Sequence, residues 1–147
     1  DVGNIKTASR YVDGLGGDLA IIHKKRLSGD TVKATELIGD VKGSNVLMVD
    51  DIIATAGPVC SAAQLVKDRG ARSVILGATH GVLAGQALNR LSRTEIDEIV
   101  VTDTIPLTHE ASQLGNIKVL SCAEMLGEAI RRIHKNESVS SLFDTIH

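Results

Sequence analysis

Short apolar runs alternate along the chain with segments in which apolar residues recur every three or four positions. The apolar runs predict β-strands at Asp18–His23, Glu36–Val41, Asn45–Asp51, Ser73–Thr79, Glu98–Thr102 and Ile117–Leu120. The segments with helical periodicity predict helices over Ile5–Val12, Val59–Arg69 and Ala123–His134. Strands that alternate with helices predict an α/β fold: a doubly wound, mainly parallel sheet with helices on both faces, in one domain over residues 1–147.

Two of the predicted helices are amphipathic, and their apolar faces are expected to pack inward. In the middle helix that face consists of Val59, Ala62, Ala63 and Val66. In the last helix it consists of Leu126, Ala129, Ile130 and Ile133, with a surface pair of Glu128 and Arg132 four positions apart. The polar segment Leu27–Thr35 is expected to be a mobile loop between two strands.

Composition narrows the classes of function. The net charge of -2 provides no basic field for nucleic acid, and Tyr11 and Phe143 are the only aromatic residues, so base stacking is not expected. No apolar stretch is long enough to span a bilayer, and no signal peptide opens the chain. Cys60 and Cys122 form no CxxC pair and are expected to be reduced thiols. These features together favour a cytoplasmic protein without a membrane or nucleic-acid partner.

One local pattern points to chemistry. The apolar run Val46–Val49 ends in two adjacent carboxylates, Asp50 and Asp51, and a loop of small residues follows. The residues of that loop are Ala54, Thr55, Ala56, Gly57 and Pro58. Acids at the carboxyl end of a parallel strand can hold ribose hydroxyls or a divalent metal, and backbone N–H groups at a helix start can hold a phosphate. The order predicts a sugar-phosphate site, although an acid pair alone is more often a solvated strand end.

The pattern of Asp-Asp, two apolar residues and a Thr-Ala-Gly loop resembles the loop that binds phosphoribosyl diphosphate (PRPP) in type I phosphoribosyltransferases and ribose-phosphate pyrophosphokinases. Further segments resemble the second of these families, also called PRPP synthetases, across nearly the whole chain. They are Ala20–Arg26, Leu37–Val41, Thr79–Gly81, Val100–Pro106, Ala129–His134 and Glu137–Phe143. The ordered set is far more specific than the loop alone, and it implies the type I phosphoribosyltransferase fold.

The resemblance implies transfer of diphosphate from Mg-ATP to the anomeric hydroxyl of ribose 5-phosphate, for nucleotide biosynthesis. By resemblance, Asp50 and Asp51 bind the ribose hydroxyls, and Ala54–Pro58 cradles the 5-phosphate. Lys24 and Arg26 lie on a loop that closes over the transferring phosphates, which suits a reaction that depends on positioning and charge stabilisation. Without the resemblance, this basic segment is more often a solvated turn.

The same resemblance implies a Mg²⁺ cofactor, a homo-oligomer, and ribose 5-phosphate and ATP as the ligands of the full-length enzyme. Asp1 is a weak candidate for a metal ligand. Ser138 and Ser140 match positions near an allosteric phosphate site at a subunit interface, and an ordinary polar tail is an equal alternative. His80 is expected to be a hydrogen-bonded histidine at a strand end rather than a proton carrier.

Two residues of the loop depart from the family pattern, and so does the length. Ala54 stands where the family usually has an acid, and Pro58 stands where it usually has Thr. Pro58 supplies neither a hydroxyl nor an N–H, so weak ribose 5-phosphate binding is expected. The chain corresponds to the C-terminal half of a family member and is expected to be inactive alone. A catalytically silent regulatory or assembly protein is the alternative, and a free-standing phosphoribosyltransferase is a more distant one.

Overall fold

The computed structural model describes residues 5–26 and 33–143. The first half of the chain forms α1 (Ile5–Leu15), β1 (Ile21–Arg26), β2 (Lys33–Ile38), β3 (Asn45–Ile53) and α2 (Gly57–Asp68). The second half forms β4 (Ser73–Gly81), α3 (Ala87–Leu91), β5 (Glu98–Thr102), α4 (His109–Ser112), β6 (Ile117–Leu120), α5 (Ala123–His134) and the 3-10 turn η2 (Ser140–Leu142). The predicted strands and helices are therefore present, with bounds shifted by a few residues.

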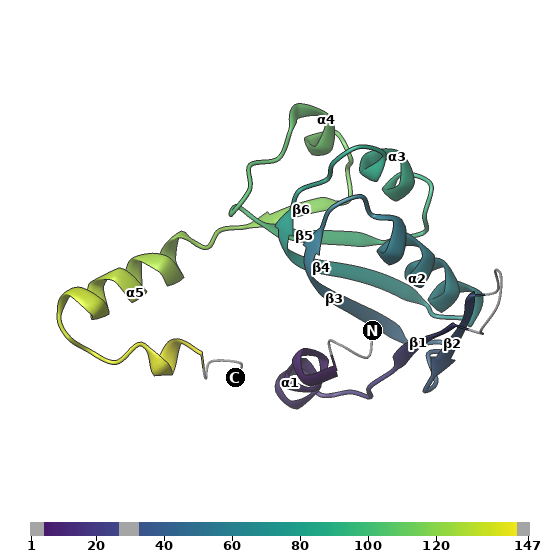
Figure 1. Ribbon diagram of the computed structural model, residues 1–147, viewed down its shortest axis with the longest axis horizontal. Coiled ribbons are helices and arrows are strands. Elements are labelled where there is room, and N and C mark those ends of the chain that lie inside the picture. The colour runs from purple at the N-terminus through teal and green to yellow at the C-terminus, as the bar shows by residue number, and fades with distance from the viewer. Residues whose placement is uncertain (1–4, 27–32, 144–147) are drawn as a thin grey trace.

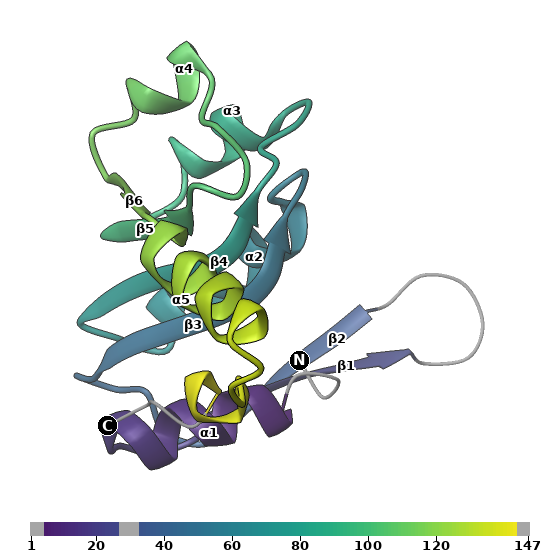
Figure 2. The same cartoon turned by 90° about the vertical axis from the view of Figure 1, so that its left-hand side faces the viewer.

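A parallel sheet in the order β3-β4-β5-β6 forms the centre of the molecule, as Figure 1 shows. This sheet and its flanking helices confirm the predicted α/β class. The strands β1 and β2 do not join it among the described residues. They pair with each other as an antiparallel ribbon, which projects from the body in Figure 2. The sequence did not reveal this separate ribbon, because apolar patterning identifies strands but not their partners.

The core lies between the sheet and α2. Along β4, the residues that point toward α2 are buried and alternate with half-buried ones on the opposite face. Fully buried side chains of this core include Val74, Leu76, Ile99 and Val101 from the sheet, packed with Ala63 and Val66 of α2. Burial of such side chains contributes about 1.5–3 kcal/mol each relative to exposure. This packing fixes α2, and with it the loop between β3 and α2.

The last helix is not packed as its pattern suggested. Leu126, Ile130 and Ile133 of α5 are exposed at 52%, 68% and 66%, so the prediction that these side chains point inward was wrong. Figure 1 shows α5 standing clear of the sheet. An amphipathic pattern reveals an apolar face but not what covers it. The surface pair was predicted correctly, because Arg132 Nε lies 2.7 Å from Glu128 Oε1. No helix among the described residues is long and apolar enough to cross a membrane.

Candidate functional site: a carboxylate pair and a phosphate-type loop

The two carboxylates of the predicted site lie near the carboxyl end of β3, where the strand continues to Ile53. Because side chains alternate along a strand, Asp50 and Asp51 point to opposite faces. Asp50 is half-buried and lines an apolar cavity of about 230 Å³ together with Pro58 and Val59 at the start of α2. Asp51 is exposed and lies outside that cavity. The pair therefore reaches two sides of the sheet edge rather than one pocket.

The surroundings of Asp50 favour its protonated form. Burial raises the pKa of the Asp50 carboxyl above its ordinary value of 3.8, and the hydrogen bond and charge of Asp51 raise it further. The backbone N–H of Asp51 donates to Asp50 Oδ1 at 3.0 Å and opposes this shift in the pKa. A carboxylate of this kind gains stability when a polar ligand replaces its lost hydration.

The loop between β3 and α2 contains unpaired backbone donors. Ala56 adopts the left-handed conformation with φ of 58°, and α2 begins at the next residue, Gly57. Within the described part of the chain, no hydrogen bond uses the N–H groups of Thr55, Ala56 or Gly57. Free N–H groups at the positive end of a helix dipole form an anion site. Pro58 occupies the first turn of α2, where its missing N–H removes one further donor.

Three contacts from later in the chain hold the loop. The N–H groups of Leu83 and Ala84 donate to the carbonyl oxygens of Ile53 and Ala54 at 3.0 and 2.9 Å. Arg90 Nη1 donates to the carbonyl oxygen of Thr55 at 2.7 Å. Sequence reasoning missed these residues, because they lie about thirty positions beyond the loop and form no motif with it.

The carboxyl ends of β4 and β5 are joined beside this loop by a polar cluster. His80 Nδ1 lies 2.8 Å from Thr104 Oγ1, and Thr102 Oγ1 donates to the carbonyl oxygen of Thr79 at 2.7 Å. His80 is thus hydrogen-bonded at a strand end, as expected from the sequence. The network connects neighbouring strands at the edge where ligands bind in open α/β sheets.

The predicted catalytic cations lie on the projecting ribbon. Lys24 and Arg26 belong to β1 and face Thr35 and Lys33 of β2 in the backbone register. Placing them on a loop was therefore wrong: β1 extends through Arg26, because the ladder with β2 continues past the apolar run that ends at His23. Their side chains and residue Asp1 fall outside the described part of the structure.

The tail residues with a predicted allosteric role lie apart from the loop. Ser138 and Ser140 are exposed, and Ser138 Oγ donates to Ser140 Oγ at 3.1 Å. Arg132 of α5 donates to the Ser138 carbonyl oxygen at 3.0 Å, which holds the tail against this helix. Figure 1 shows this segment beyond α5, away from α2.

The described residues contain no group of three or more His, Cys, Asp or Glu side chains that could hold a metal ion. Mg²⁺ does not need such a group, because it commonly keeps several waters and binds one or two carboxylates together with substrate phosphates. Asp50 and Asp51 each offer one such carboxylate, on opposite sides of the strand end. Cys60 and Cys122 are free thiols, as the sequence predicted.

Comparison with known proteins identifies the family of this fold and loop. Residues 26–144 match the family described as the phosphoribosyl synthetase-associated domain. The chain belongs to this phosphoribosyl synthetase family. The resemblance drawn from the loop and the ordered segments is thereby confirmed. The match includes the carboxylate pair, the loop and Arg90.

Named relatives agree with this phosphoribosyl synthetase assignment. The chain is 47% identical over 143 residues to the ribose-phosphate pyrophosphokinase of Bordetella pertussis, covering 97% of the chain and 46% of the relative. It is 46% identical over 144 residues to that of Chromobacterium violaceum, covering 98% of the chain and 44% of the relative. The chain thus spans about half the length of these relatives.

A solved structure supports the fold of this phosphoribosyl synthetase chain. The phosphoribosylpyrophosphate synthetase of Mycobacterium smegmatis is similar with a TM-score of 0.83 and 37% sequence identity. The similarity covers 91% of the chain and 43% of that structure. A type I phosphoribosyltransferase-like architecture, as the sequence predicted, is therefore shared with a synthetase.

Proposed function

We propose that this chain is the sugar-phosphate-binding part of a ribose-phosphate pyrophosphokinase. The complete enzyme transfers diphosphate from Mg-ATP to the C1 hydroxyl of ribose 5-phosphate and forms PRPP. The observation that carries the proposal is the row of unpaired N–H groups at Thr55, Ala56 and Gly57, in the loop that follows the strand with the carboxylate pair. Relatives with the name ribose-phosphate pyrophosphokinase, at 46–47% identity, support the same assignment.

Each part of the site has a separate role in the proposal. The N–H groups of the loop and the start of α2 bind the dianionic 5-phosphate. Asp50 and Asp51 accept hydrogen bonds from ribose hydroxyls on either side of the strand end. Lys24 and Arg26, on the ribbon, supply positive charge to the transferring diphosphate. The ribbon projects from the body in Figure 2, and its closure over a bound ligand would exclude water.

Magnesium belongs to this proposal as an ion carried by the substrate. Bound Mg²⁺ supplies charge neutralisation on the diphosphate during its transfer. Because Asp50 and Asp51 lie on opposite sides of the strand, one of the two carboxylates would face such an ion. The remaining ligands would be phosphate oxygens and water. Homo-oligomer formation and a cytoplasmic location are part of the same proposal, and so is a phosphate-binding role for Ser138 and Ser140.

The isolated chain is proposed to bind ribose 5-phosphate weakly and to make no PRPP. It spans about half the length of its relatives, and Pro58 removes one backbone donor and one hydroxyl from the loop. Ala54 and Pro58 also favour a second candidate, a catalytically silent member that serves regulation or assembly. The two candidates differ in whether the loop binds the sugar phosphate.

Isothermal titration of the chain with ribose 5-phosphate, with and without Mg²⁺, tests the proposal. Ribose and glucose 6-phosphate are the matched controls. Ribose lacks the phosphate, and glucose 6-phosphate lacks the ribose ring. Weak, saturable binding of ribose 5-phosphate that exceeds both controls is expected. Equal heats for all three sugars, or none, would contradict a sugar-phosphate site and favour the silent candidate.

A further inference from the structure

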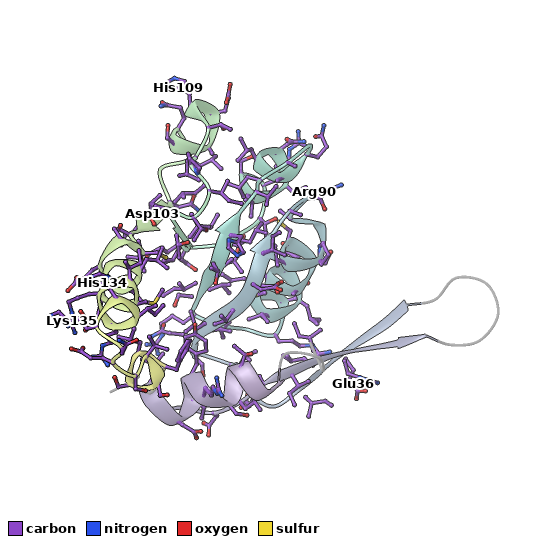
Figure 3. The ribbon with its side chains drawn as sticks, turned by 60° about the vertical axis from the view of Figure 1, so that its left-hand side comes forward. Glu36, Arg90, Asp103, His109, His134 and Lys135 are labelled. Atoms are coloured by element: carbon purple, nitrogen blue, oxygen red, sulfur yellow. The ribbon has the colours of Figure 1, made fainter. Side chains whose placement is uncertain are left out.

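Arg90, at the end of α3, reaches the loop that is proposed to bind phosphate. Its Nη1 donates to the carbonyl oxygen of Thr55 at 2.7 Å, and a Cβ placed on Gly57 would lie 3.5 Å from the same nitrogen. Figure 3 labels Arg90 and draws its side chain at the end of α3. The guanidinium therefore binds the residue before Ala56 and lies close to Gly57, the residue after it.

The backbone around Arg90 is itself held in place. The Arg90 N–H donates to the Gln86 carbonyl oxygen at 3.0 Å. The Arg90 carbonyl oxygen accepts from Thr94 Oγ1 at 2.8 Å. Leu91, the next residue, is 2% exposed and anchors α3 in the core. The guanidinium is thus presented from a fixed base rather than from a free surface turn.

We infer that Arg90 is a positioning residue, which orients the loop N–H groups toward the anion without contacting it. In a trans peptide the C=O and N–H groups point in opposite directions. A hydrogen bond that holds the Thr55 carbonyl toward Arg90 consequently aims the Ala56 N–H to the other side. Arg90 and a phosphate bound by the Ala56 N–H would lie on opposite sides of this peptide, so Arg90 is placed to hold the loop rather than to bind that phosphate.

The conformation of Ala56 explains why such a restraint is needed. Its φ of 58° lies in the left-handed region, which a residue with a Cβ rarely adopts without support. The contact from Arg90 fixes the peptide before this residue, and α2 fixes the chain after it. Preorganised donors bind an anion more tightly than donors that must first be ordered. The inference rests on the proposed function, because it assumes that the loop binds the 5-phosphate.

The test compares Arg90→Met with Arg93→Met in this chain. Arg93 lies three positions further on, and among the described residues its side chain makes no hydrogen bond or ion pair, so it controls for the lost charge. A lost charge-assisted hydrogen bond predicts about ten- to hundredfold weaker ribose 5-phosphate binding for Arg90→Met. Arg93→Met is expected to bind like the parent chain. Equal affinity of all three proteins, or equal losses in both variants, would overturn the inference.

A second measurement separates this inference from the proposed function. In the unliganded chain, NMR compares the Thr55 carbonyl carbon and the Ala56 amide between the parent and Arg90→Met. Shifts confined to residues 55–57, with an unchanged denaturation midpoint, are expected. If the parent binds no ribose 5-phosphate, the proposed function fails while these shifts still support the positioning of the loop. Unmoved resonances, or changes spread across the sheet with a lowered midpoint, would overturn it.

Discussion

Replacing Pro58 by Thr is expected to strengthen ribose 5-phosphate binding. Pro58 is exposed in the first turn of α2, directly beside the unpaired N–H groups of the loop. Threonine restores a backbone N–H and adds a hydroxyl, and each can donate to the phosphate. A hydrogen bond to a charged group contributes about 1.5–3 kcal/mol, and about 1.4 kcal/mol corresponds to a tenfold change in affinity. One new bond therefore predicts about ten- to hundredfold tighter binding.

The same substitution is expected to lower the stability of the free chain slightly. Loss of a proline that fits its backbone costs about 0.4–1 kcal/mol through the unfolded state. Isothermal titration and urea denaturation of Pro58→Thr measure the two effects separately. Pro106→Thr is the matched control, because Pro106 is also exposed and lies in the segment between β5 and α4. The reasoning is refuted if Pro58→Thr binds no more tightly than Pro106→Thr and the parent.

Two further predictions concern stability. Ile99→Ala is expected to lower the free energy of unfolding by about 2–5 kcal/mol, because Ile99 is 0% exposed, whereas Ile130→Ala at 68% exposure is expected to change it by less than about 0.5 kcal/mol. Urea denaturation tests this pair, and comparable losses would show that α5 is covered in solution. Asp50→Asn is expected to be more stable than the parent at pH 7. A raised pKa of the Asp50 carboxyl stabilises the folded chain at pH values below the ordinary pKa of 3.8. This stabilisation is lost as the pH rises through the pKa that the carboxyl has in the folded state. The greater stability of Asp50→Asn is therefore expected to disappear at low pH. A stability difference between variant and parent that stays constant across pH 3–7 would contradict burial as the cause of the raised pKa.

Local features of the site could be read from the sequence. The apolar run before Asp50 and Asp51, followed by small residues and a proline, predicted the strand end and the start of α2 to within two residues. Such signals depend on neighbouring residues only, so periodicity and helix-start chemistry suffice. The family resemblance rested on the same contiguous motifs.

Contacts between distant segments could not be read in this way. The bond from Arg90 to Thr55 joins positions 35 residues apart, and an isolated arginine in the last turn of a short helix has many other uses. The left-handed turn falls on Ala56 although Gly57 is adjacent, because α2 begins at Gly57. The apolar face of α5 was visible in the sequence, but what covers that face is not a local property.

The central claim is that the loop after β3 binds the phosphate of a ribose phosphate through its backbone N–H groups. Titration of isotope-labelled chain with ribose 5-phosphate, followed through the amide resonances, tests it most directly. We expect saturable shifts that centre on Thr55, Ala56, Gly57 and Val59, with smaller shifts at Asp50 and Asp51. Shifts that centre on other residues, or spectra that stay unchanged at millimolar ligand, would contradict it.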